Sequence, residues 1–110
     1  MDEKLEKEWT RTVSIISKNF GEEIDVMTIL FLIGMQELDK GYQKLNKDQK
    51  LEVIHIGLCV IFEPYGYYTK SGRDNEGWPH FEQKNTFSCI NENEQESLIK
   101  KTIINYFIDN

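Results

Sequence analysis

The sequence predicts a mainly α-helical protein, a small four-helix bundle-like domain with a β-hairpin inserted between the third and fourth helices. Apolar residues recur at helical spacing in four segments, and capping or helix-breaking residues mark the ends of those segments. Between the last two segments, about residues 65–84, glycines and aromatic residues interrupt the helical pattern. A chain of 110 residues has room for one core, so a single domain over residues 1–110 is expected.

The first helix is predicted near residues 2–20, because its apolar residues fall on one helical face. Asp2 is placed to cap this helix and Gly21 to end it. The residues of the apolar face are Leu5, Trp9, Val13, Ile16 and Phe20.

The second helix is predicted near residues 25–40 and is apolar almost all round over 29–35. Such a helix must contact neighbours on several sides. Gly34 lies in this apolar stretch, and a glycine there lets a neighbouring backbone approach closely.

The third helix is predicted near residues 46–63. Asn46 and Gln49 have the spacing of a capping box, and Pro64 must close the helix because proline cannot continue its hydrogen-bond ladder. Apolar residues cover most of this helix too, so the second and third helices are expected to be the most buried pair. The apolar residues of the third helix leave a narrow polar stripe, formed by Asp48, Glu52, His55, Cys59 and Glu63.

Hairpin strands are predicted near residues 65–71 and 78–84, joined by a turn at residues 73–77 (Arg-Asp-Asn-Glu-Gly). The fourth helix is predicted near residues 92–108. Two capping pairs are possible at its start, Asn91 with Glu94 or Asn93 with Glu96.

The hairpin segment also carries a resemblance to known proteins. Gly-Tyr-Tyr at residues 66–68, Gly-Arg-Asp at 72–74 and Gly-Trp-Pro-His-Phe at 77–81, followed by a closing helix, resemble a family of small uncharacterised bacterial proteins of the Bacteroidota. That family has no assigned activity, so the resemblance implies no catalytic residue. It implies that the loop is a defining feature.

Charge and cysteine content argue against several functional classes. The net charge of −6, with lysines scattered singly or in pairs, argues against a nucleic-acid partner. No apolar run is long enough for a membrane span, and the charged start of the chain is unlike a secretory signal, so a cytoplasmic location without membrane contact is expected. Cys59 and Cys89 lack the spacing of a zinc or redox site and are expected to be reduced thiols.

The polar stripe of the third helix allows two chemical interpretations. Glu52 and His55 have the Glu-x-x-His spacing of di-iron bundles, but such a site needs a second motif that the chain lacks. His55, Cys59 and Glu63 could form a nucleophile with its base and acid, although such groups normally converge from different elements. The structural interpretation of both sets is favoured, and no metal, cofactor or catalytic residue is expected.

The hairpin provides the candidate binding residues: Tyr67, Tyr68, Arg73, Asp74, Trp78 and His80. Aromatic, arginine and hydrogen-bonding side chains of this kind are enriched at the surfaces through which proteins bind partners. The competing interpretation is structural: the aromatics cover the core, Asp74 and Gly77 form the turn, and Arg73 pairs with a local carboxylate.

The leading expectation is therefore a non-enzymatic interaction or regulatory module whose hairpin contacts another protein or a second copy of the chain. The alternative is a small-molecule binder or minor enzyme that uses Arg73, Trp78 and His80 in a pocket between hairpin and helices. The sequence identifies neither the partner nor the oligomeric state.

Overall fold

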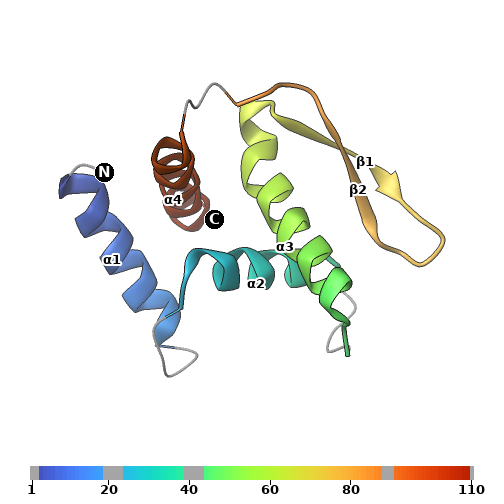
Figure 1. Cartoon of the computed structure of the whole chain (residues 1–110), viewed down its shortest axis with the longest axis horizontal. Coiled ribbons are helices and arrows are strands. Elements are labelled where there is room, and N and C mark those ends of the chain that lie inside the picture. The colour runs from blue at the N-terminus through green and yellow to red at the C-terminus, as the bar shows by residue number, and fades with distance from the viewer. Residues whose placement is uncertain (1–2, 19–23, 39–43, 88–90, 110) are drawn as a thin grey trace. The chain divides into compact units, whose positions relative to one another are not determined.

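Four α-helices and one β-hairpin make up the computed structural model, which describes residues 3–18, 24–38, 44–87 and 91–109 (Figure 1). The mainly α class, with the hairpin between the third and fourth helices, is confirmed. In chain order the elements are α1 (Glu3–Ser17), α2 (Val26–Leu38), α3 (Lys47–Phe62), the 3₁₀ turn η1 (Glu63–Tyr65), β1 (Tyr68–Arg73), β2 (Pro79–Gln83) and α4 (Glu92–Asp109).

The described chain falls into two compact units. One contains α1 and α4, and the other spans residues 27–87 with the hairpin. The expectation of a single domain stays a prediction. The predicted caps Asp2 and Gly21, together with Phe20 and Cys89, lie outside the described residues.

Helix α3 begins and ends as its sequence predicts. The Asn46 side chain accepts a hydrogen bond from the Gln49 N–H at 2.8 Å, and the Gln49 side chain accepts one from the Asn46 N–H at 3.0 Å. After Phe62 the chain tightens into η1, which places Pro64 in the first turn of a new helix, where its missing N–H costs nothing. Gly66, with φ 83°, ends this turn in the left-handed region.

The first strand therefore starts later than predicted. The segment from 65 was expected to be extended, but η1 and Gly66 occupy its beginning, and β1 runs from Tyr68 to Arg73. The second strand, β2, falls within the predicted range. The physical reason is that a 3₁₀ turn continues the helical path for one turn past Phe62 before the chain can reverse.

Helices α2 and α3 touch backbone to backbone at two glycines. A Cβ atom added to Gly34 would lie 2.0 Å from the carbonyl oxygen of Val53, and one added to Gly57 would lie 2.0 Å from the carbonyl oxygen of Leu30. The close approach predicted at Gly34 is confirmed. Gly57 of α3 makes an equivalent close contact with the backbone of α2. Contacts this close bring Cα–H groups against carbonyl oxygens, which adds weak attraction to the packing.

The same two helices supply most of the buried side chains, as the sequence predicts. In α2 the buried residues are Ile29, Leu30, Ile33, Gly34 and Leu38. In α3 they are Val53, Ile56, Gly57, Cys59, Ile61 and Phe62. Helix α1 buries Val13 alone.

In the other unit, α1 packs against α4, and Val13 contributes its buried side chain. Lys100 of α4 lies 5.3 Å from the ring centre of Trp9, which is a cation–π contact. Of the two capping pairs considered for α4, the structure has the first: the Asn91 side chain accepts a hydrogen bond from the Glu94 N–H at 2.9 Å.

The glycine contact gives a direct stability prediction. We expect Gly34→Ala and Gly57→Ala each to lower the free energy of unfolding by about 2 kcal/mol, since overpacking against a backbone carbonyl outweighs the roughly 1 kcal/mol gained in helix propensity. Chemical denaturation of both variants measures the change. Gln36→Ala, at an exposed position of α2, is the matched control and should leave stability nearly unchanged. Alanine variants as stable as the wild type would contradict the contact.

Candidate functional site

The hairpin is the candidate functional site. Its two strands pair antiparallel, with Thr69 opposite Glu82 and Lys70 opposite Phe81. A bulge at Ser71 then shifts the register, so that Gly72 lies opposite His80. The bulge lies beside Gly72, whose φ of 126° is readily adopted only by glycine.

Asp74 organises the turn between the strands. Its carboxylate oxygen Oδ1 accepts hydrogen bonds from the N–H groups of Glu76 at 2.9 Å and Trp78 at 3.0 Å. Its backbone N–H donates to the Trp78 carbonyl and its carbonyl accepts from Gly77, both at 3.0 Å. The turn predicted at residues 73–77 is confirmed, with Gly77 at φ 87°.

The other oxygen of the Asp74 carboxylate reaches the imidazole of His80. The distance from Oδ2 to Nε2 is 3.0 Å, and the side chains of Asp74 and His80 are 39% and 55% exposed. The hydrogen bond with His80 and the one from the Trp78 N–H hold the pKa of the Asp74 carboxyl below its usual value. The turn therefore carries an exposed imidazole paired with an ionised carboxylate.

Trp78 points into the core of its unit. Only 6% of its surface is exposed, and it belongs to a buried cluster with Leu38, Val53 and Ile56. Phe81 of β2 packs against the same cluster. Of the two roles considered for Trp78, its burial favours the structural one.

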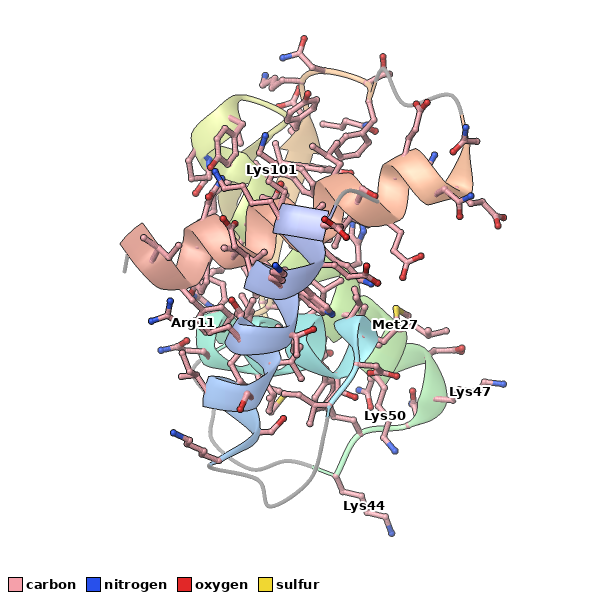
Figure 2. All side chains as sticks on the ribbon, turned by 90° about the vertical axis from the view of Figure 1, so that its left-hand side faces the viewer. Arg11, Met27, Lys44, Lys47, Lys50 and Lys101 are labelled. Atoms are coloured by element: carbon pink, nitrogen blue, oxygen red, sulfur yellow. The ribbon has the colours of Figure 1, made fainter. Side chains whose placement is uncertain are left out.

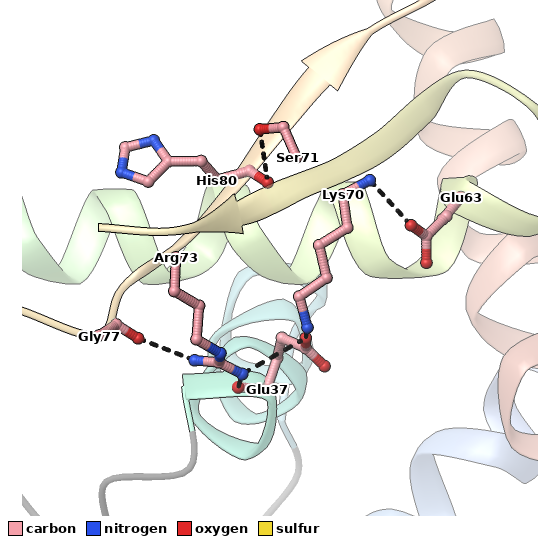
Figure 3. Close-up of polar contacts among 7 residues, drawn as sticks. All are labelled: Glu37, Glu63, Lys70, Ser71, Arg73, Gly77 and His80. Carbon is pink, nitrogen blue, oxygen red and sulfur yellow. Dashed lines mark hydrogen bonds and ion pairs between the residues drawn. The ribbon is translucent and has the colours of Figure 1, made fainter. Parts of the chain in front are cut away.

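Arg73 and Lys70 both join the hairpin to Glu37 in the last turn of α2 (Figure 3). Lys70 forms an ion pair with the Glu37 carboxylate, and one guanidinium nitrogen of Arg73 donates to the Glu37 carbonyl at 3.0 Å. The other guanidinium nitrogen donates to the Gly77 carbonyl at 2.8 Å. Helix α2 has no basic residue in its last turn, so β1 supplies the cations that its negative end favours.

Tyr67 and Tyr68 pack in an aromatic cluster beside the end of α3. The ring of Tyr67 stacks on Phe87 with centroids 4.7 Å apart, and Phe62 meets both rings edge-on at 5.6 and 4.9 Å. Tyr68 is 7% exposed and meets His55 edge-on at 6.0 Å. These aromatics cover the end of the core.

The polar stripe of α3 takes part in structural contacts. Cys59 is fully buried, and its sulfur lies 3.5 Å from Nε2 of His55. Burial raises the pKa of the Cys59 thiol to about 12, so the group is protonated at neutral pH. The Glu63 carboxylate accepts a hydrogen bond from the Lys70 N–H at 3.0 Å (Figure 3). In the described part of the chain no three His, Cys, Asp or Glu side chains gather as a metal site would need.

The six predicted site residues thus lie in one hairpin but face different ways. Tyr67, Tyr68 and Trp78 pack inward, and Arg73 reaches α2, which leaves His80 with Asp74 on the exposed side. Sequence reasoning missed Glu37 as the anchor of β1. A signal existed, because an acidic residue in the last turn of a helix is unfavourable unless a cation from elsewhere meets it.

The exposed face of the hairpin also includes residues that sequence reasoning did not select. Glu82 lies opposite Thr69 in the sheet, and its side chain is 65% exposed. Strand alternation places both on the side that carries His80. This surface, formed by Thr69, Asp74, His80 and Glu82, is named the outer face below.

Three lysines project around the start of α3, namely Lys44, Lys47 and Lys50 (Figure 2). None of the ion pairs found among the described side chains involves them. No aromatic residue lies between them in sequence, unlike the basic stripes of nucleic-acid grooves. The absence of a nucleic-acid partner stays a prediction.

No helix within the described ranges combines the length and apolarity needed to cross a bilayer.

The burial of Trp78 predicts a large stability effect. We expect Trp78→Ala to lower the free energy of unfolding by about 3–5 kcal/mol, the usual cost of emptying a core site. Arg73→Ala removes hydrogen bonds on a partly exposed side chain and should cost about 1 kcal/mol. Urea denaturation measures both variants, with Leu51→Ala, at a half-exposed site, as the control. An effect of Trp78→Ala no larger than that of Leu51→Ala would refute its place in the core.

The protonated state of Cys59 predicts a thiol without nucleophilic reactivity. We expect iodoacetamide to leave Cys59 unmodified in the native protein at neutral pH, because the reactive thiolate is scarce and the sulfur is buried. Peptide mass spectrometry measures modification at Cys59 alone, and the same reaction in denaturant is the control. Rapid native modification would contradict both the burial and the raised pKa.

The chain was compared with protein-family models, with curated proteins and with solved structures. None of the three comparisons found a match. The resemblance of residues 66–81 to small Bacteroidota proteins therefore stays a prediction.

Proposed function

We propose that this protein is a non-enzymatic interaction module whose hairpin contacts another protein. The observation that carries the proposal is the two-sided construction of the hairpin. One side is fixed by Trp78 in the core and by Glu37 at the end of α2. The other side presents the outer face.

A fixed hairpin is suited to recognition because binding of a partner does not include the free-energy cost of ordering the hairpin. Loops that are held in one conformation before binding lose less entropy on association. The turn is closed by four hydrogen bonds of Asp74, and the strands are anchored to α2 by Lys70 and Arg73. The outer face is therefore presented in one geometry.

The chemistry of the hairpin and of α3 supports binding over catalysis. A cysteine nucleophile needs a thiolate, and burial keeps the Cys59 thiol protonated. The Asp74–His80 pair resembles the orienting half of a catalytic dyad, yet the His80 side chain has Asp74 as its one polar partner among the described residues. Its geometry suits a hydrogen-bonding contact with a partner.

The alternative, a ligand pocket at Arg73, Trp78 and His80, has less support. Such a pocket needs the three side chains to converge on one space. Trp78 is buried with Leu38, Arg73 is bonded to Glu37 and Gly77, and His80 lies on the outer face.

A capture experiment with matched variants tests the proposal. His80→Ala combined with Glu82→Ala should weaken binding of a captured partner about tenfold, equal to about 1.4 kcal/mol, because it removes the hydrogen-bonding groups of the outer face. The bait is the full chain, incubated with extract of its native host. The captured protein is then purified, and its affinity is measured by calorimetry.

The control bait carries Glu52→Ala and Lys50→Ala, two exposed positions on α3. It should bind like the wild type, and both baits should melt within a few degrees of it. A partner that binds the outer-face variant and the wild type equally would refute the proposed role of the hairpin.

A further inference from the structure

The peptide group between Gly77 and Trp78 is hydrogen-bonded at both of its ends. Its carbonyl, which belongs to Gly77, accepts a hydrogen bond from Nη1 of Arg73 at 2.8 Å. Its N–H, which belongs to Trp78, donates to Oδ1 of Asp74 at 3.0 Å. Glycine restricts the rotation of an adjacent peptide plane less than any other residue. The two hydrogen bonds therefore contribute directly to the orientation of this peptide group.

The same guanidinium group also reaches out of the hairpin. Its second nitrogen, Nη2 of Arg73, donates to the carbonyl of Glu37 at 3.0 Å (Figure 3). Helix α2 ends at Leu38, so this carbonyl is among the last four, which have no partner within the helix. The guanidinium is planar and rigid, and it fixes the spacing and direction of its two donors. Arg73 therefore places the Gly77–Trp78 peptide group relative to the end of α2.

The Asp74 carboxylate connects this peptide group to His80. Oδ1 accepts from the Trp78 N–H, and Oδ2 lies 3.0 Å from Nε2 of His80. The hydrogen bond with His80 holds the pKa of the Asp74 carboxyl below its usual value, so the carboxylate is ionised at neutral pH. An ionised carboxylate can only accept, so Nε2 of His80 carries a hydrogen. The other ring nitrogen, Nδ1, is then left for a partner.

We propose that Arg73 is a positioning residue that fixes the orientation of His80 on the outer face. It acts through the Gly77–Trp78 peptide group and the Asp74 carboxylate, without touching the partner. This inference rests on the proposed function, since it assigns the residue that prepares the outer face for binding. An imidazole that is already oriented loses less conformational entropy when a partner binds.

The burial of Trp78 does not supply this orientation. The indole packs with Leu38 and Val53, which fixes where the side chain lies. Apolar packing is non-directional, whereas a hydrogen bond specifies the direction of the group that makes it. The directions of the peptide group and of the Asp74 carboxylate therefore depend on the hydrogen bonds, including the one from Arg73.

Arg73→Lys tests the first step, because lysine keeps the positive charge and lacks the planar fork. Amide hydrogen exchange is measured by NMR on the full chain. The Trp78 N–H should exchange about tenfold faster in the variant, as expected when a hydrogen bond that closes the turn is lost. The Lys84 N–H donates to the Tyr67 carbonyl at the other end of the hairpin, and its exchange should stay unchanged.

Lys70→Gln is the matched control. It removes the ion pair with the Glu37 carboxylate and leaves the two hydrogen bonds of Arg73 in place. Lys70 lies within β1, opposite Phe81, and outside the turn. The Trp78 N–H should therefore exchange at the wild-type rate in this variant. Equal acceleration in Lys70→Gln and Arg73→Lys would show that charge at Glu37 controls the turn, and would overturn the role of the fork.

The ring of His80 reports the last step. Nitrogen-15 chemical shifts, measured at mildly alkaline pH where imidazoles are neutral, show which ring nitrogen carries the hydrogen. The wild type should carry it mainly on Nε2, and Arg73→Lys should shift the ring toward a mixture of both forms. Asp74→Asn replaces the acceptor opposite Nε2 and should abolish the preference while Arg73 is intact. It is the second variant, and it does not depend on how Arg73→Lys folds.

Faster exchange at Trp78, unchanged exchange at Lys84 and a lost preference in the His80 ring together support the inference. Wild-type exchange at Trp78 in Arg73→Lys overturns it, and so does equal acceleration at Lys84, which would mean that the whole hairpin loosens. A His80 ring that either variant leaves unaltered also overturns it.

These measurements use the free chain, so they are independent of the capture experiment. A chain that captures no partner through His80 and Glu82 would contradict the proposed function and leave the NMR result standing. A captured partner that depends on both residues would support the proposed function even if Arg73→Lys leaves the turn unchanged.

Discussion

The contact between the backbones of α2 and α3 is the constraint on which the hairpin-bearing unit depends. Gly34 faces the Val53 carbonyl and Gly57 faces the Leu30 carbonyl, and both positions lack room for a Cβ atom. Because each helix places a glycine against a backbone carbonyl of the other, the two helix axes lie closer together than larger side chains would permit. This crossing sets where the end of α2 lies relative to α3, and therefore where the hairpin can dock.

The hairpin docks on that helix pair by apolar and by polar contacts. Trp78 enters the cluster that Leu38 and Val53 build across the two helices. Glu37, one residue before the end of α2, receives Lys70 and Arg73 from β1. A two-stranded hairpin is marginally stable alone, so these contacts are what hold it in one conformation.

Docking by one face leaves the hairpin with two unequal edges. The edge of β1 is closed by the Glu63 carboxylate and by a bulge, while the sheet of the described residues has no further strand beside β2. The proposed function rests on the difference between the docked side of the hairpin and its outer face. It also separates two kinds of residue in the hairpin: Trp78 and Arg73 hold the scaffold, and His80 and Glu82 are presented by it.

Local patterns in the sequence determined the four helices, the capping box at Asn46 and the turn at Asp74. Each depends on residues a few positions apart, whose conformational preferences act without the rest of the fold. The roles of Lys70 and Arg73 depended on Glu37, a partner more than thirty residues away. From the sequence Arg73 could be a binding anchor or could pair with a local carboxylate, and the structure places it against the carbonyl of Glu37. Tertiary structure alone decided this, because burial and long-range pairing are set by how α2 and α3 pack.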